Sequence, residues 1–241
     1  MSDSDQALVS RAQGSLLGQL AGDALGSMVE FHSRAGIARD YPGGLRTMGA
    51  SPVWGTLAGQ PTDDSEMALV LVRLLTDANE FDEEQVANAY TFWRESDPFD
   101  VGGTIRRATD AMIHARQSGT SLSAGARAAA NLQSEANGAL MRQSPLALWG
   151  IQHTEESLNR LVREDTALTH PNRVWQDASA GFIVALSACI HEGLDGEATY
   201  QRACSWHRQY GASPSITSAL SKARRQAPNC EQNQGHVLIA L

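Results

Sequence analysis

The sequence predicts an all-α fold, built as one compact bundle of many helices. Aromatic residues make up only 6% of the chain, alanine is abundant, and few runs of β-branched residues alternate with period two. Apolar residues instead recur at helical spacing, as in Met67, Leu71 and Leu74. A chain of 241 residues with 42% hydrophobic content can bury one sizeable core, so we expect a single domain over residues 1–241.

Short connections join the predicted helices, apart from one long gap near the N-terminus. In chain order the helices cover residues 8–28, 64–78, 83–95, 102–117, 122–136, 138–151, 155–167, 173–192, 196–209 and 213–224. The gap at 32–61 carries Pro42-Gly43-Gly44, Ser51-Pro52 and Gly55, which break any continuous helix. A loop of this length in a helical domain is usually functional.

The first predicted helix has a glycine face. It carries Gly14, Gly18, Gly22 and Gly26 at a strict spacing of four. Each glycine costs up to about 1 kcal/mol in a helix interior, and close approach of another helix is the simplest reason to tolerate that cost. We therefore expect a second helix to pack closely on this face.

Charge and composition exclude several classes of protein. The 19 basic and 27 acidic residues give a net charge of -8, which repels a phosphate backbone, so nucleic-acid binding is not expected. No stretch approaches the roughly 20 apolar residues of a membrane helix, and Asp3 and Asp5 stand where a secretory signal is basic. The 3 cysteines lack CxxC spacing and fit a reducing compartment, so we expect a cytoplasmic protein with no membrane partner.

Three oxygen-bearing side chains, Thr62, Asp63 and Asp64, begin the second predicted helix. Thr62 is a good N-cap, and the two carboxylates favour the positive end of a helix dipole. A hydroxyl and two adjacent carboxylates are also hard oxygen ligands of the kind that Mg²⁺ prefers. Chemistry alone therefore predicts either a helix cap or a metal site.

Further carboxylates stand at other predicted helix ends. Asp23 and Glu30 are seven positions apart, so they share a face if the first helix continues through Met28 and Val29. Otherwise Asp23 is a buried hydrogen-bond anchor and Glu30 a solvent-exposed charge. Asp100 precedes another predicted helix, where capping is the alternative to a catalytic role.

Two polar positions near helix boundaries are also candidates. Asn137-Gly138 interrupts an alanine-rich stretch, and its polar side chain either binds a ligand or marks a helix boundary. His170 lies in Leu168-Thr169-His170-Pro171 at the end of another helix. A lone histidine in this setting is more often structural than catalytic.

In order and separation, these segments resemble the ADP-ribosylglycohydrolase family, which includes the dinitrogenase reductase activating glycohydrolase. The resemblance rests on Gly18-Gln19-Leu20-Ala21-Gly22-Asp23-Ala24-Leu25-Gly26, Val29-Glu30-Phe31, Thr62-Asp63-Asp64-Ser65, Asp100-Val101-Gly102, Asn137-Gly138-Ala139-Leu140-Met141-Arg142 and Leu168-Thr169-His170-Pro171. It implies an all-helical orthogonal bundle that holds two Mg²⁺ or Mn²⁺ ions in a cleft. It also implies a metal-dependent hydrolase that removes ADP-ribose from a modified protein side chain, often arginine, or from a small ADP-ribose conjugate.

The resemblance assigns a role to each matching residue. The expected metal ligands are Thr62, Asp63 and Asp64. The expected catalytic residues are Glu30, which matches an acidic residue beside the metal and substrate, and Asp100, which matches a loop carboxylate proposed as the base. The expected substrate-binding residues are Gly102, Asn137, Gly138, Met141 and His170.

The sequence departs from the family pattern in two places. Gly103 stands where many relatives carry asparagine. Relatives also continue into an Asp-x-Asp-Thr motif that supplies the rest of the two-metal site, whereas this sequence stops within an apolar run at 235–241. The nearest substitutes, Glu164-Asp165-Thr166 and Asp195-Gly196-Glu197, belong to earlier segments. We therefore expect a domain truncated at its C-terminus, whose second metal site is incomplete or is completed by a second chain.

Two other classes of function stay open beside the hydrolase. One is a catalytically inactive relative that binds ADP-ribose or an ADP-ribosylated protein without cleaving it. The other is a structural or interaction module whose apolar end pairs with another subunit. Release of ADP-ribose from an arginine-modified substrate would separate the enzyme from both.

Overall fold

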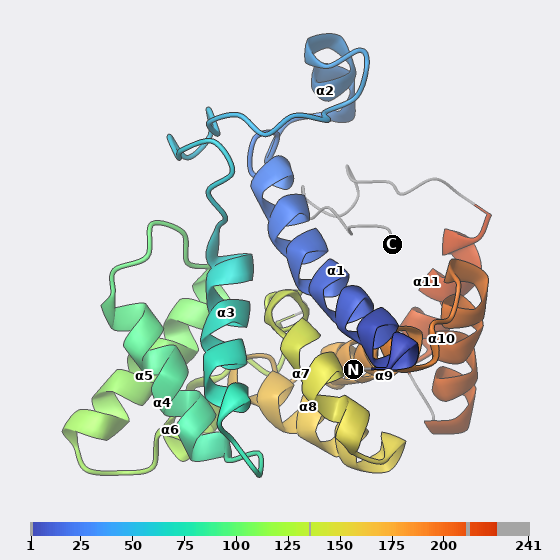
Figure 1. Cartoon of the computed structure of the whole chain (residues 1–241). Coiled ribbons are helices and arrows are strands. Elements are labelled where there is room, and N and C mark those ends of the chain that lie inside the picture. Colours follow the sequence, from blue (N-terminus) through green and yellow to red (C-terminus); the bar gives the residue numbers. More distant parts are fainter. Residues whose placement is uncertain (1, 135, 211–212, 226–241) are drawn as a thin grey trace.

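The computed structural model describes residues 2–134, 136–210 and 213–225, and every regular element within these ranges is helical. The all-α prediction is therefore confirmed. In chain order the elements are α1 (Asp3–Gly26), α2 (Arg34–Asp40), α3 (Asp63–Thr76), α4 (Glu83–Glu95), α5 (Gly103–Gln117), α6 (Leu122–Ala129), η1 (Leu140–Arg142), α7 (Ser144–Trp149), η2 (Gly150–Gln152), α8 (Glu155–Thr169), α9 (Arg173–Glu192), α10 (Gly196–Tyr210) and α11 (Pro214–Ala223) (Figure 1).

The core lies where α3, α4, α5, α7, α8 and α9 meet. Its fully buried side chains include Leu71, Tyr90, Met112, Val162 and Ile183, each from a different helix. The helix α8 packs on α9, α9 on α10, and α5 on α6. Figure 1 shows α1 as a long diagonal helix that runs from the α9 end of the bundle toward α2, which stands apart from the core. This arrangement leaves the C-terminal end of α1 free to border a cleft.

The helix α1 begins and ends earlier than predicted. Ser2 and Asp5 form a reciprocal capping box, which accounts for the start at Asp3 rather than at residue 8. The predicted end at residue 28 is two residues too late, and the condition for Asp23 and Glu30 to share a helix face is not met, because the backbone after Gly26 passes into successive turns. Asp23 is therefore helical, whereas Glu30 lies on a turn.

The glycine face of α1 is not covered as expected. A Cβ atom built at Gly14, Gly18 or Gly26 would meet no other atom within 4 Å. The predicted close approach of a second helix is therefore not found among the described residues.

One helix was missed inside the predicted loop at 32–61. The helix α2 begins after Ser33, whose side chain caps the amide of Gly36, and it ends before Pro42. None of its residues is buried, so it has no apolar stripe that would predict a helix. The capping serine is the one signal in the sequence that marks its start.

Two predicted helices are shorter or broken. The helix predicted at 122–136 ends at Ala129, because Ala130 is extended and the Asn131 side chain accepts a hydrogen bond from the amide of Gln133. The helix predicted at 138–151 is divided into η1, α7 and η2. Pro145 explains the break between η1 and α7, since it has no amide hydrogen to continue a helix from the preceding turn.

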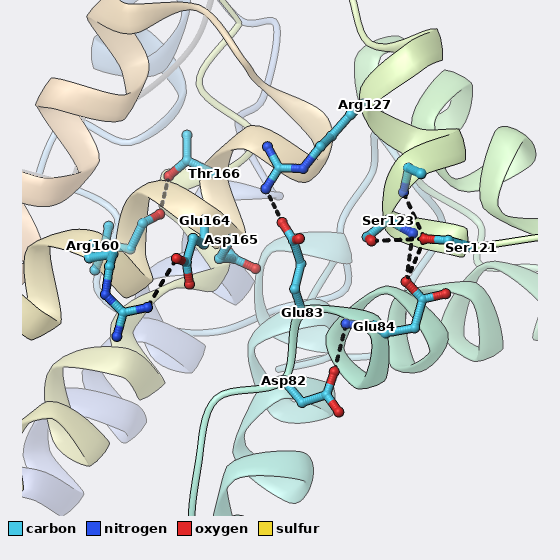
Figure 2. Close-up of polar contacts among 12 residues, drawn as sticks. Asp82, Glu83, Glu84, Ser121, Ser123, Arg127, Arg160, Glu164, Asp165 and Thr166 are labelled. Carbon is cyan, nitrogen blue, oxygen red and sulfur yellow. Dashed lines mark hydrogen bonds and ion pairs between the residues drawn. The ribbon is translucent and has the colours of Figure 1, made fainter.

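The start of α6 is fixed by α4, as Figure 2 shows. The carboxylate of Glu84 accepts hydrogen bonds from the amide of Ser123, at 3.1 Å, and from the hydroxyl of Ser121, at 3.0 Å. The neighbouring Glu83 forms an ion pair with Arg127 on α6. Side chains of α4 therefore satisfy the free amides at the N-terminus of α6.

Two sequence-based expectations fall partly or wholly outside the described residues. The apolar run at 235–241 lies there entirely, so the structure does not bear on how the bundle is completed. The membrane prediction is tested only on the described ranges, where no helix combines the length and the apolar character needed to cross a bilayer.

Candidate active site

A cleft of about 410 Å³ lies among the C-terminal end of α1, the first turns of α3 and α5, and the segment that precedes η1. All ten residues proposed from the sequence line this one cleft. They are Glu30, Thr62, Asp63, Asp64, Asp100, Gly102, Asn137, Gly138, Met141 and His170. Segments up to 140 positions apart in the sequence are thus brought together, since Glu30 and His170 are the two extremes.

Asp23 fixes the start of α3 at the base of this cleft. Its carboxylate accepts hydrogen bonds from the amides of Thr62, at 3.0 Å, and Ser65, at 3.1 Å. It also accepts the hydroxyl of Thr62 at 2.7 Å. Of the two roles considered for Asp23, the structure therefore supports the buried hydrogen-bond anchor. Thr62 is the N-cap residue of α3, as predicted, but its side chain makes no capping hydrogen bond, and Asp23 accepts the amide of Ser65 instead.

Asp63, Asp64 and Asp100 crowd negative charge into the cleft. Burial, followed by the charges of Asp64 and Asp100, raises the pKa of Asp63 to about 9. Burial and the charges of Asp23 and Glu30 raise the pKa of Asp64 to about 7. The pKa of Asp100 is raised to about 6, again by burial first and then by the charge of Glu30. No cationic side chain of the described residues lines the cleft to offset these charges.

The donors at the start of α3 fit a divalent cation in chemical type. Thr62, Asp63 and Asp64 offer hard oxygen atoms, and a bound cation would relieve the repulsion that raises the carboxylate pKa values. In the part of the chain that the structure describes, however, no three Asp, Glu, His or Cys side chains already converge as a metal-binding group. The motif thus has suitable oxygen donors without a ready-made coordination sphere.

The two expected catalytic carboxylates lie on loops. Glu30 follows the end of α1, and its Oε2 accepts a hydrogen bond of 2.7 Å from the indole Nε1 of Trp54. Asp100 lies before α5 but does not cap it, because the N-cap is Gly102 and no side chain binds the free amides there. The capping interpretation of Asp100 is therefore wrong, and its half-buried carboxylate borders the cleft.

Because Gly138 has no side chain, the ring of His170 and the side chain of Ile105 can pack against its backbone. A Cβ atom at Gly138 would lie 3.0 Å from Ile105 Cδ1 and 3.2 Å from His170 Cε1, closer than nearly all real side chains permit. His170 itself is 1% exposed. Its ring therefore packs against the backbone of the Asn137-Gly138 turn, and any larger residue at 138 would displace it.

A buried relay determines which nitrogen of His170 carries the proton. Arg142 Nη1 donates to the hydroxyl of Thr169 at 2.9 Å, and that hydroxyl lies 2.8 Å from His170 Nδ1. Since the hydroxyl already accepts from Arg142, we assign its proton to the bond with Nδ1. Burial, and then the charge of Arg142, lowers the pKa of His170 to about 3. The ring is therefore neutral and carries its proton on Nε2, which has no partner among the described residues.

Comparison with known proteins agrees with this geometry. The family model for ADP-ribosylglycohydrolase matches residues 4–241. The chain belongs to the ADP-ribosylglycohydrolase family. It is 33% identical over 187 residues to the ADP-ribosyl-[dinitrogen reductase] glycohydrolase of Rhodospirillum rubrum, covering 77% of this chain and 58% of that protein. It is 28% identical over 199 residues to the ADP-ribosylarginine hydrolase Tri1 of Pseudomonas putida (strain GB-1), covering 80% of this chain and 48% of that one.

The fold comparison leads to the same family. A solved structure titled ADP-ribosylglycohydrolase-related protein complex superimposes with a TM-score of 0.74 at 25% identity, covering 92% of this chain and 70% of the other. The chain thus spans about half of the length of the curated relatives it matches.

The two substitutes considered for the missing family motif are engaged elsewhere. Asp165 is fully buried, away from the cleft, and accepts hydrogen bonds from Tyr90, Arg142 and Gln143. Asp195 accepts the amide of Ala198 at the start of α10. Neither carboxylate lines the cleft of this ADP-ribosylglycohydrolase family member.

Trp54 is the site residue that sequence reasoning missed. It lies in the long loop between α2 and α3, and its contact with Glu30 joins positions 24 apart. No local pattern predicts such a contact, although the loop itself was expected to be functional. Arg142 is part of the Asn137–Arg142 motif in the sequence. Its link to His170 through the hydroxyl of Thr169 also depends on the tertiary structure.

Proposed function

We propose that this chain carries the ADP-ribose-binding cleft of a metal-dependent hydrolase that removes ADP-ribose from a modified protein side chain, with arginine as the first candidate. The observation that carries the proposal is the convergence of all ten candidate residues on one cleft. The two relatives named above, one of them an ADP-ribosylarginine hydrolase, support the choice of reaction and linkage. A small ADP-ribose conjugate is the other substrate that such a cleft would accept.

The proposed reaction is hydrolysis at the anomeric carbon of the ribose. The bond from that carbon to the side-chain nitrogen breaks, the nitrogen keeps the electron pair and gains a proton, and water supplies the new oxygen. The transition state resembles an oxocarbenium ion, so a nearby carboxylate both stabilises it and accepts the proton of the water. Asp100 is the better candidate for the base, because its pKa of about 6 leaves it ionised at neutral pH while Glu30 is already bound by Trp54.

The remaining cleft residues would bind the rest of the substrate. Thr62, Asp63 and Asp64 would hold Mg²⁺ or Mn²⁺, which would orient the ribose hydroxyls and polarise a water when bound. No arginine of the described residues lines the cleft, so the diphosphate would be held by backbone amides at the start of α5. Gly103 adds no side chain beside these amides, and a Cβ atom there would meet nothing within 4 Å. The amide of Gly102 itself is directed at the Asp63 carboxyl.

The test is release of ADP-ribose from an ADP-ribosylarginine peptide, followed by chromatography. We expect product with Mg²⁺ or Mn²⁺ and a loss of activity with chelator that added metal restores. The double variant Asp63→Asn, Asp64→Asn should be inactive and should lose metal binding by calorimetry. Product formation at the same rate in chelator would overturn the metal assignment.

A second candidate is a protein that binds ADP-ribose without cleaving it. It is favoured by one observation, the absence of a converged group of metal-ligating side chains among the described residues. Calorimetry separates the two: tight binding of ADP-ribose, with no release from any ADP-ribosylated substrate at saturating metal, would favour the binder.

A further inference from the structure

Three aromatic side chains form a cluster at the mouth of the cleft, which we call the aromatic rim. Trp54 is central, with its ring centroid 6.1 Å from that of Phe31 and 5.9 Å from that of Phe99. Phe31 lines the cleft itself. The three residues come from the end of α1, the loop before α3 and the loop before α5, so the rim exists only in the folded chain.

The rim exposes aromatic surface where burial would be the usual outcome. The side chains of Phe31 and Phe99 are 67% and 42% exposed. Phe31 also has a backbone φ of 61°, in the left-handed region that a bulky residue rarely adopts. Such strain concentrates at functional sites, where it is tolerated because it positions a side chain.

Two carboxylates, Glu30 and Asp100, lie next to rim residues in the sequence. In the sequence, Phe31 directly follows Glu30 and Phe99 directly precedes Asp100, and Glu30, Phe31 and Asp100 all line the cleft. Trp54 links the rim to the cleft through its hydrogen bond to Glu30. Aromatic faces beside carboxylates attract a cation, and Arg guanidinium is a frequent partner because it is planar and stacks on rings.

None of the cation–π contacts made by the described arginines involves the rim. They join Arg142 to Tyr90, Arg163 to Trp206 and Arg224 to Tyr200. The described part of the chain therefore supplies no arginine of its own to these three rings, and their faces are available to a cation of the substrate.

We infer that the aromatic rim is the subsite for the leaving group, and that it binds the planar guanidinium of the modified arginine. This inference rests on the proposed function and makes it more specific. The carboxylates of the cleft activate the attacking water or stabilise the ribose, and the rings immediately outside hold the cationic group that departs. The rim thus selects arginine-linked ADP-ribose over linkages to an uncharged hydroxyl residue.

The experiment replaces a phenylalanine of the rim by leucine, which removes the aromatic ring and keeps an apolar side chain of similar size. In the full chain, Phe31→Leu and Phe99→Leu should each raise the KM for ADP-ribosylarginine about tenfold, the larger end of a cation–π contribution. The Kd for free ADP-ribose, measured by calorimetry, should change by less than about twofold, a shift within the range of ordinary surface substitutions. Phe92→Leu is the matched control, because Phe92 is 71% exposed on α4 and does not line the cleft.

Each outcome decides between the alternatives. If both rim variants weaken ADP-ribose as much as ADP-ribosylarginine, the rim stacks on the nucleotide and the inference is overturned. Unchanged KM values in both variants overturn it as well. If the wild-type chain releases no ADP-ribose, the proposed function fails; the affinities for ADP-ribosylarginine and ADP-ribose are then compared by calorimetry, and a selective loss of the former still supports the rim.

Discussion

Two groups of buried carboxylates in this protein have opposite surroundings. Away from the cleft, Asp165 accepts hydrogen bonds from Tyr90 at 2.6 Å, from Gln143 at 2.7 Å and from Arg142 at 3.3 Å. Within the cleft, Asp63 and Asp64 face other carboxylates and no cation of the described residues. Asp165 and Asp63 are both buried, so the difference between these two lies in their partners. A fully partnered carboxylate holds the fold together, whereas a crowded one favours a cation or a proton.

The largest expected effect is a loss of stability when the hydrogen-bonded carboxylate of Asp165 loses its cationic partner. Arg142→Met should lower the free energy of unfolding by about 3–5 kcal/mol, because it leaves Asp165 buried without its positive partner. Urea denaturation followed by circular dichroism measures this. The control is Arg39→Met, which breaks an ion pair with the exposed Asp40 and should cost under about 1 kcal/mol. Equal losses in the two variants would show that the buried pair is not special.

For Asp63 in the cleft, a substitution is expected to change activity and not stability. Asp63→Asn should lower hydrolysis of ADP-ribosylarginine by about 100-fold or more, since it removes a proposed metal ligand, roughly 2.7 kcal/mol of transition-state stabilisation. The metal-free chain should be no less stable, because the asparagine replaces a carboxyl whose pKa is raised to about 9. Asp40→Asn, at an exposed carboxylate, is the control. A variant that loses stability along with activity would make Asp63 a structural residue.

The contrast also predicts a pH dependence. Asp63 and Asp64 have folded pKa values of about 9 and about 7, above the ordinary value near 4, so the folded chain keeps protons that the unfolded chain has lost. The contribution of these groups to stability is therefore greatest below about pH 4 and decreases as the pH rises through about 9. In chelator, the free energy of unfolding should fall more steeply with pH for the wild type than for Asp63→Asn. Parallel curves would contradict the assignment.

The smallest expected effect concerns the position of Glu30. Trp54→Phe keeps an aromatic ring but removes the indole N–H that binds Glu30. A hydrogen bond to a charged group contributes about 1.5 kcal/mol, so kcat should fall by at most about tenfold. The KM for ADP-ribosylarginine should change much less, because the ring face is retained. A rise in KM with unchanged kcat would instead assign Trp54 to binding alone.

Much of the site was predictable because its residues lie in short, local motifs. Thr62, Asp63 and Asp64 are consecutive, and Asn137 and Gly138 mark a turn; their local chemistry left two interpretations open, and the resemblance to a family assigned them to one site. Trp54 was not predictable, since its role depends on a contact with a residue 24 positions away. The same is true of the relay that sets the protonation of His170. Such contacts leave no periodic pattern in one sequence.

Helix boundaries also divide into those that a local sequence pattern predicts and those that it does not. The extents of α4 and α9 match the ranges predicted from apolar periodicity, because an amphipathic helix carries its own pattern. The break before α7 is marked in the sequence by Pro145, which lies in the first turn of that helix. The helix α2 has no buried residue, so periodicity gave no sign of it. The end of α1 at Gly26 is marked by no breaker other than the glycine itself.

Taken alone, the sequence determined the all-helical class, the main amphipathic helices and the chemical types of side chain available for a site. These properties follow from residue identity and from spacing over a few helical turns. Only the tertiary structure decided which carboxylates are paired with cations and which are left to repel one another, because that depends on which distant segments share a low-dielectric interior. Asp165 and Asp63 are the same residue type, and their partners alone make one an anchor of the fold and the other a candidate ligand.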